Sequence, residues 1–257
     1  MRRGGAVSIA RVFLKLLFVA AGVLTISWSV STYQRVFPFR DLEAVGFRIS
    51  LGETFQPSVL EGVEPDADRA IAAVDCNTPA IRSAVFVKVQ LYEIKGGETD
   101  RLALNKLSSD LRGAIRKSIS CSPYDPFFWF VRYWIEVSSS GVSEKALRYL
   151  EMSYETGPNE GWIALRRNRF ALAVFPSLGS ELQKKVLAEF SELVDAGFVD
   201  LAAANLAGPG WPVREQLLAG LADVGRYNRE QFARLLEDQG IRVDIPNAEP
   251  RPQRYWN

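Results

Sequence analysis

The feature that most constrains the fold is an uncharged stretch near the N-terminus. Eighteen consecutive residues from Leu16 to Tyr33, LLFVAAGVLTISWSVSTY, contain no Asp, Glu, Lys or Arg. The apolar residues 12–14 extend the stretch to about 20 residues, with Lys15 reaching outward, and a helix of that length crosses a bilayer core. Trp28 and Tyr33 lie toward the distal end, where amphipathic rings favour the membrane interface. The sequence therefore predicts a transmembrane anchor over residues 16–34.

The basic residues around this stretch predict its orientation. The first 40 residues carry no acid, and four basic residues precede the anchor while two follow it: Arg2, Arg3, Arg11 and Lys15, then Arg35 and Arg40. The positive-inside rule places the more basic side in the cytoplasm. We therefore expect residues 1–15 to form a cytoplasmic basic segment and the rest of the chain to lie outside. The alternative is a cleaved signal peptide, although TISWSVSTYQ offers only a poor cleavage site.

Several residue types and motifs that chemistry needs are missing. The chain has no histidine, which excludes Ser-His-Asp and Cys-His catalysis and any zinc site that needs an imidazole, and two cysteines are too few for a four-thiolate site. It also contains neither GxxxxGK[ST] nor a GxGxxG motif after a strand. Residues 41–257 carry 25 basic and 30 acidic residues, so they lack the basic surface that nucleic acids require. We expect a non-catalytic protein without a cofactor, a metal or a nucleic-acid partner.

The two cysteines are candidates for a disulfide bond. Helix-ending signals at Pro79, at the KGG of residues 95–97 and at Pro123 indicate helices near 65–76, 79–95 and 99–120. Consecutive helices joined by short loops run antiparallel, so the first and third are parallel and bring Cys76 and Cys121 to the same end. A bridge closing a loop of about 45 residues stabilises a fold by roughly 4 kcal/mol in an oxidising compartment. The alternative is two buried free thiols.

The rest of the chain has the pattern of a mainly α protein. We expect a linker over residues 35–64, with one strand-like piece at 45–51 where apolar and polar residues alternate. Further helices are predicted at 125–141, 142–158, 160–179 and 180–197, with Ser143 and Ser180 as N-caps. Two or three shorter helices follow, one of them starting at Pro212. The polar, proline-bearing residues 245–257 are predicted to form a flexible tail.

A repeat is visible in the middle of the chain. Pro123 and Pro158 are 35 residues apart, and each is followed by an acid and a tryptophan. A helix–turn–helix period near 34 is typical of tetratricopeptide repeats. The segment from Phe127 resembles that family at Ala146, Leu150 and Pro158. It departs from the family at first-helix positions, where Phe130, Tyr133 and Trp134 replace the usual Trp, Leu and Gly.

This resemblance implies a fold and a location. It implies antiparallel helix hairpins in a right-handed solenoid over residues 65–244, preceded by the transmembrane helix. As a whole, the chain is similar to small membrane-anchored tetratricopeptide-like proteins that accompany polysaccharide synthesis and export in the bacterial envelope. The resemblance thus implies a scaffold in the bacterial inner membrane, with a periplasmic domain that holds protein partners. Contact of that domain with polysaccharide is a further possibility that the resemblance leaves open.

The candidate binding residues lie on one arginine-rich helix, GWIALRRNRFALAVF. In a tetratricopeptide-like unit, the resemblance places Trp162, Leu165, Arg169 and Leu172 on the groove surface, and Arg166 lies on an adjoining line. We expect the arginines to pair with acids of the preceding helix, namely Glu144, Glu151 and Glu155. The alternative is that Arg169 binds a carboxylate or phosphate of a partner, which a guanidinium fork suits.

Two other functions stay open. One is a carbohydrate-binding or carbohydrate-active protein, in which Asp125, Glu136 and Glu160 are candidate carboxylates. An aromatic cluster in the same region forms either a sugar platform or a buried core helix: Phe127, Phe128, Trp129, Phe130, Tyr133 and Trp134. The other is a regulatory partner of a cell-wall enzyme.

Overall fold

The structure, a computed structural model, describes residues 4–96 and 101–248. Every element in these two ranges is helical, so the expectation of a mainly α protein is confirmed. Arg2, Arg3 and most of the predicted tail lie outside the described residues. The chain divides into two compact units, Met1–Leu107 and Ser108–Asn257, and the boundary falls inside the helix α5 (Arg101–Cys121).

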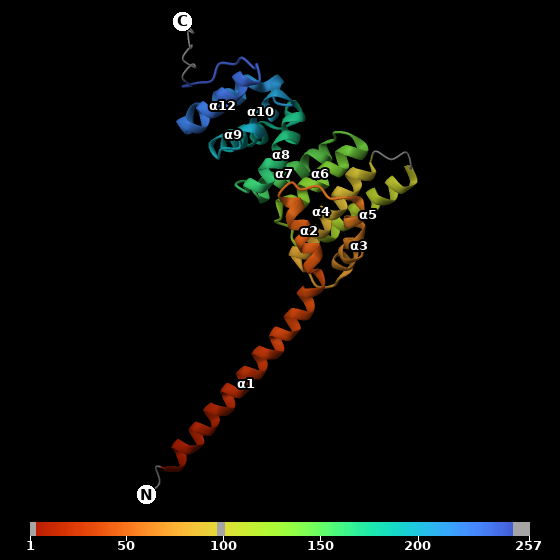
Figure 1. Cartoon of the computed structure of the whole chain (residues 1–257), viewed down its shortest axis with the longest axis vertical. Coiled ribbons are helices and arrows are strands. Elements are labelled where there is room, and N and C mark those ends of the chain that lie inside the picture. Colours follow the sequence, from red (N-terminus) through yellow and green to blue (C-terminus); the bar gives the residue numbers. More distant parts are fainter. Residues whose placement is uncertain (1–3, 97–100, 249–257) are drawn as a thin grey trace. The chain divides into compact units, whose positions relative to one another are not determined.

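The N-terminal helix α1 (Gly4–Val36) is one continuous helix that contains the predicted anchor (Figure 1). It includes an 18-residue window with a mean hydropathy of 1.9, none of it buried against the rest of the chain. The side chains from Val12 to Gln34 are exposed. By length and composition, α1 is therefore able to cross a membrane.

The rest of the first unit is built around one buried helix. A short 3₁₀ turn, η1 (Phe37–Phe39), leads into α2 (Arg40–Ser50), α3 (Pro57–Ala72) and α4 (Thr78–Lys95). Both α2 and α3 pack on α4, which is buried along most of its length from Ala80 to Leu91. The side chain of Gln90 on α4 accepts a hydrogen bond from the Phe55 amide at 3.1 Å and donates to the Glu53 carbonyl at 3.0 Å, which fixes the α2–α3 loop.

The expected strand-like piece at 45–51 was wrong, because residues 45–50 belong to α2 and Leu51 is its C-cap. The buried residues of α2 are Leu42, Gly46 and Ile49, whose spacings of four and three are those of one helical face. Phe47 and Leu51, which suggested an alternating strand, are 64% and 68% exposed. The segment predicted as a linker, residues 35–64, is largely helical, and the boundary between the two units lies after residue 107.

The second unit contains the C-terminal part of α5 and seven further α-helices among the described residues. The helices and 3₁₀ turns are α6 (Pro126–Ser140), α7 (Glu144–Thr156), α8 (Gly161–Ala173), η2 (Phe175–Ser177), α9 (Ser180–Asp195), α10 (Val199–Ala207), η3 (Trp211–Val213), α11 (Arg214–Ala219), η4 (Gly220–Asp223) and α12 (Arg226–Asp238). The most extensive packing is between α6 and α7, and α12 packs on both α9 and α10.

Local signals explain several helix ends. Ser143 caps α7 as predicted, because its hydroxyl accepts a hydrogen bond from the Ala146 amide at 3.2 Å. Gly141 ends α6 with a φ of 76°, a conformation that favours glycine. Ser180 is the first residue of α9 rather than its cap, which is Gly179. Both cysteines, Cys76 and Cys121, are in the disulfide-bonded state and not free thiols.

Candidate binding site

The arginine-rich helix α8 carries one fully buried guanidinium, that of Arg167. Its Nε donates to Oε1 of Glu189 on α9 at 2.7 Å, and Nη1 and Nη2 donate to the carbonyls of Ser153 and Gly157 at 2.6 and 2.8 Å. The guanidinium also lies 4.0 Å from the ring centroid of Tyr154. Arg167 therefore joins α7, the turn after it and α9.

The partner carboxylate of Arg167 is the centre of a buried polar network. Glu189 accepts a hydrogen bond from the Tyr154 hydroxyl at 2.6 Å and one from the Asn168 amide at 3.3 Å. The side-chain Oδ1 of Asn168 in turn accepts from Nδ2 of Asn205 on α10 at 3.1 Å. Burial raises the pKa of Glu189 above its usual range, although the Arg167 charge opposes this rise. The network holds helices together and is closed to solvent.

The expected pairing with acids of the preceding helix does not describe Arg167. Its carboxylate partner comes from α9, the following helix, while Glu144 pairs with Arg148 on its own helix at 2.5 Å. A sequence signal for this burial exists. Arg167 and Asn168 lie in the middle of the buried stripe that consists of Ile163, Ala164, Arg167, Asn168, Ala171 and Leu172. Apolar residues lie four positions before and after them, so the helical period alone puts Arg167 and Asn168 on that apolar face.

The five predicted binding residues of α8 do not share one environment. Leu172 is only 2% exposed and belongs to the core. Trp162, Leu165 and Arg166 are half-buried, and the Trp162 indole donates to Oε2 of Glu160 at 2.7 Å. Arg169 is exposed. Of the predicted arginines, Arg169 is thus the one that lies open to solvent.

The aromatic cluster of α6 is largely core. Phe127, Phe128, Phe130 and Tyr133 are at most 6% exposed, as a buried helix requires and a sugar platform does not. Trp129 is half-buried, and its indole donates to the Pro123 carbonyl at 2.7 Å.

Of the three candidate carboxylates, Asp125 caps α6 by accepting a hydrogen bond from the Phe127 amide at 3.0 Å.

A second polar cluster lies on α5, α6 and α7 and opens to solvent. It lines a pocket of about 120 Å³ with four cationic side chains, one carboxylate and two isoleucines: Arg112, Ile115, Arg116, Arg132, Ile135, Glu136 and Lys145. All seven residues belong to the second unit. We take this pocket as the candidate binding site.

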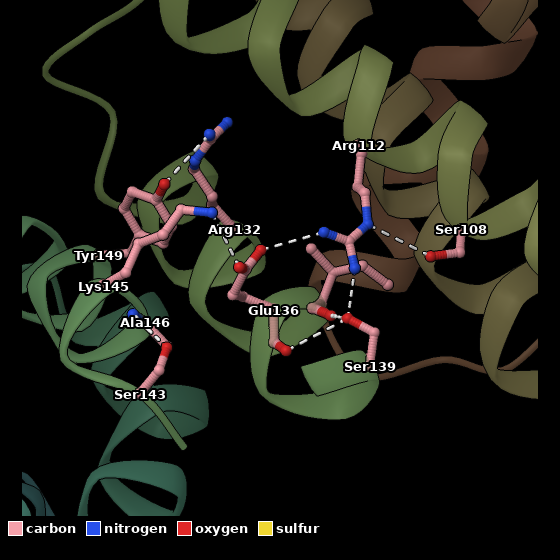
Figure 2. A network of polar contacts seen from close by, with 10 residues as sticks. Ser108, Arg112, Arg132, Glu136, Ser139, Ser143, Lys145, Ala146 and Tyr149 are labelled. Atoms are coloured by element: carbon pink, nitrogen blue, oxygen red, sulfur yellow. Dashed lines mark hydrogen bonds and ion pairs between the residues drawn. The ribbon is translucent and has the colours of Figure 1, made fainter. Parts of the chain in front are cut away.

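The Glu136 carboxylate lies between two of the cations, as Figure 2 shows. Its Oε2 accepts from Nη1 of Arg112 at 3.0 Å, and its Oε1 accepts from Nζ of Lys145 at 2.9 Å. Arg112 also donates to the hydroxyls of Ser139 and Ser108. The hydrogen bond from Lys145 holds the pKa of Glu136 below its ordinary value, with Arg112 adding to the effect and partial burial opposing it. Glu136 is therefore ionised at neutral pH and neutralises one of the cations.

The other two arginines have no such compensation. Arg132 donates from Nη2 to the Tyr149 hydroxyl at 3.2 Å, and its guanidinium lies 4.6 Å from the centroid of that ring (Figure 2). Arg116 is exposed on α5. Neither pairs with a carboxylate among residues 4–96 and 101–248. The lining thus holds three more cations than carboxylates, an arrangement that attracts anions.

Only one residue of this pocket was a candidate from sequence, and for a different role. Glu136 was one of three candidate carboxylates in the carbohydrate alternative, and in the structure two cations hold it. The available signal was a spacing of four, which puts Arg112 with Arg116 and Arg132 with Glu136 on one helical face each. Without the packing of α5 and α7 beside α6, that spacing does not distinguish a pocket from an ordinary solvated surface.

Comparison with known proteins adds no relative. The chain matches no protein-family model, no curated protein and no solved structure.

Proposed function

We propose that this protein is a membrane-anchored helical scaffold with no chemistry of its own. In this proposal α1 spans the bacterial inner membrane with its N-terminus in the cytoplasm, and the helical units stand in the periplasm. There they hold protein partners of an envelope assembly, one that synthesises or exports polysaccharide.

The observation that carries the proposal is the exposure of α1. A continuous apolar helix whose side chains from Val12 to Gln34 contact solvent is unfavourable in water, because exposed apolar patches on soluble proteins rarely exceed a few hundred Å². Insertion into a bilayer removes this cost. The helix leads through η1 into the α2–α4 unit without a long irregular link, so the folded part stays close to the membrane.

Helix spacing supports a repeat-like scaffold. Helices α6 and α8 begin at Pro126 and Gly161, 35 residues apart, and α7 and α9 begin at Glu144 and Ser180, 36 residues apart. Polar contacts join the successive helices: the Tyr133 hydroxyl of α6 donates to the Phe170 carbonyl of α8, and the Tyr154 hydroxyl of α7 donates to Glu189 of α9. A period of this length is that of a tetratricopeptide-like solenoid, which we propose as the arrangement of the second unit.

The alternative of a carbohydrate-active enzyme has less support. Glycosidic cleavage needs one carboxyl group free to donate a proton and a second free to attack or to activate water. The three candidates are engaged otherwise: Asp125 caps a helix, Glu136 is held by two cations, and Glu160 accepts from Trp162. Two other roles are compatible with a scaffold: binding of carbohydrate without cleavage, and regulation of a cell-wall enzyme. The identity of the partner captured by crosslinking distinguishes between them.

Two measurements in cells test the proposal. Alkaline phosphatase fused after residue 257 should be active and a green fluorescent protein fusion dark, and the opposite pair of results would overturn the orientation. A photo-crosslinking amino acid at the exposed Arg169 should then capture a defined protein of the envelope, whereas the same group at exposed Glu237 on α12 serves as a control for random collisions. Equal capture at both sites, or only cytosolic adducts, would contradict a specific periplasmic scaffold.

A further inference from the structure

The pocket on α5, α6 and α7 has the charge of an anion site. Four cations face one ionised carboxylate, and the two guanidiniums without an acidic partner, those of Arg116 and Arg132, come from different helices. Two planar guanidinium forks suit an oxyanion, because each fork can donate paired hydrogen bonds. The excess positive charge of the pocket is therefore carried by two guanidiniums that have no acidic partner in the described part of the chain.

The floor of the pocket strengthens these interactions. Ile115 and Ile135 line it and are 0% and 1% exposed, so one side of the site is apolar core. Charges beside a low-dielectric wall interact more strongly than charges surrounded by water. An anion held here would be attracted more than one on a flat, fully solvated surface.

One guanidinium is already held in place. The side chain of Arg132 is fixed by its contact with the Tyr149 ring and by its hydrogen bond to the Tyr149 hydroxyl. A pre-ordered side chain loses less conformational entropy when a ligand binds. Arg112 and Lys145 are similarly ordered by Glu136, whose carboxylate lies between them in Figure 2.

The size of the pocket limits the ligand. Sites for drug-sized molecules and cofactors occupy about 300–1,000 Å³, whereas this pocket measures about 120 Å³. A nucleotide or a whole oligosaccharide does not fit within that volume. A single phosphate or carboxylate group does, with the remainder of any larger molecule outside.

We propose that this pocket binds one small oxyanion, a phosphate or carboxylate group, with Arg116 and Arg132 as its direct ligands. Arg112 and Lys145 contribute charge while they hold Glu136 in place. The inference does not depend on the membrane orientation or on the scaffold function.

Titration calorimetry on the detergent-solubilised full chain tests this binding. Inorganic phosphate and glucuronate are titrated separately at constant ionic strength, with chloride as the background anion. Saturable binding of either supports the proposal; tighter binding of phosphate assigns a phosphate group, and tighter binding of glucuronate assigns a carboxylate. Absence of saturable binding of both at millimolar concentration would overturn it.

Three substitutions establish the location. Arg132→Gln and Arg116→Gln should each weaken binding about tenfold, because each removes charge-assisted hydrogen bonds. Arg148→Gln is the matched control, since Arg148 also lies in the second unit and is exposed, but it pairs with Glu144 and does not line the pocket. An equal loss in the control would show unspecific attraction and contradict a built site.

The substitution Glu136→Gln gives a change of opposite sign. It removes the competing carboxylate and leaves Arg112 and Lys145 free to attract the anion, so affinity should rise several-fold. A merely structural role for this cluster predicts weaker binding or none. Melting temperatures measured without ligand identify any variant that has lost its fold. If Arg132→Gln is such a variant, Arg132→Lys replaces it. Lysine keeps the charge but not the planar fork, so an intermediate loss of affinity is expected.

Discussion

At the scale of single residues, the buried pair of Arg167 and Glu189 is the most demanding feature of the chain. The exposed fraction of the two side chains is 0% and 3%, so both charges have left water. Desolvation of two ions costs several kcal/mol each, which their mutual attraction offsets only if the remaining hydrogen-bonding groups are satisfied. The Ser153 and Gly157 carbonyls and the Tyr154 hydroxyl provide that satisfaction.

Glu189→Gln should therefore lower the free energy of unfolding by about 3–5 kcal/mol, because it leaves the Arg167 charge buried without a counterion. Chemical denaturation of the detergent-solubilised chain measures the change. Glu192→Gln, at an exposed position of the same helix, should change stability by less than about 0.5 kcal/mol. Similar values for both variants would mean that the buried pair does not carry the packing of α7, α8 and α9.

At the scale of helices, the contact between α2 and α4 depends on one glycine. A Cβ added at Gly46 would lie 2.4 Å from Cβ and 2.6 Å from Cα of Ser83, which real atoms do not tolerate. Glycine weakens a helix by roughly 1 kcal/mol relative to alanine, so its presence in α2 has a packing reason. The close approach lets α2 lie directly on the buried helix of the first unit.

Gly46→Ala should destabilise the protein by about 1–3 kcal/mol through overpacking, in spite of its better helix propensity. Gly62→Ala on α3 is the matched control, because nothing lies within 4 Å of the added Cβ and the residue is exposed. That control should stabilise by up to about 1 kcal/mol. Circular dichroism during thermal unfolding of both variants measures the difference, and a stabilising Gly46→Ala would contradict the close contact.

At the scale of the whole molecule, α1 is long and apolar enough to cross a membrane, and we expect it to be the element that holds the protein there. A charge near the middle of a membrane span costs about 2.5–3.5 kcal/mol on insertion scales. Val23 lies near the centre of the apolar stretch and is 61% exposed in the structure, so a substitution there leaves the folded units intact.

Val23→Arg should shift a measurable fraction of the protein from the membrane pellet to the soluble or aggregated fraction after carbonate extraction. Val23→Leu, which keeps the span apolar, should remain in the pellet like the wild type. If the arginine variant fractionates like the leucine variant, α1 is not the element that holds the protein to the membrane.

Helix positions in this chain follow from local signals, and most of them could be predicted. Gly141, Ser143 and Pro126 act on their own backbone neighbourhood, so the bounds of α6 and α7 are close to those expected. The segment 45–51 was misassigned because alternating apolar residues fit a strand as well as a helix. Only contact with α4 shows that Leu42, Gly46 and Ile49 form the buried face.

The sequence by itself determined the apolar span, the mainly helical body and the absence of imidazole chemistry, because composition and short-range periodicity act along the chain. The tertiary structure alone decided which charges meet. Arg167 lies 22 residues from Glu189, and Arg112 lies 24 residues from Glu136. Pairing between residues so far apart in sequence depends on how the helices pack. The charges along a single helix do not show which residue of another helix each one will meet. For that reason the burial of Arg167 and the cationic pocket could not be predicted, although all of their residues can be read in the sequence.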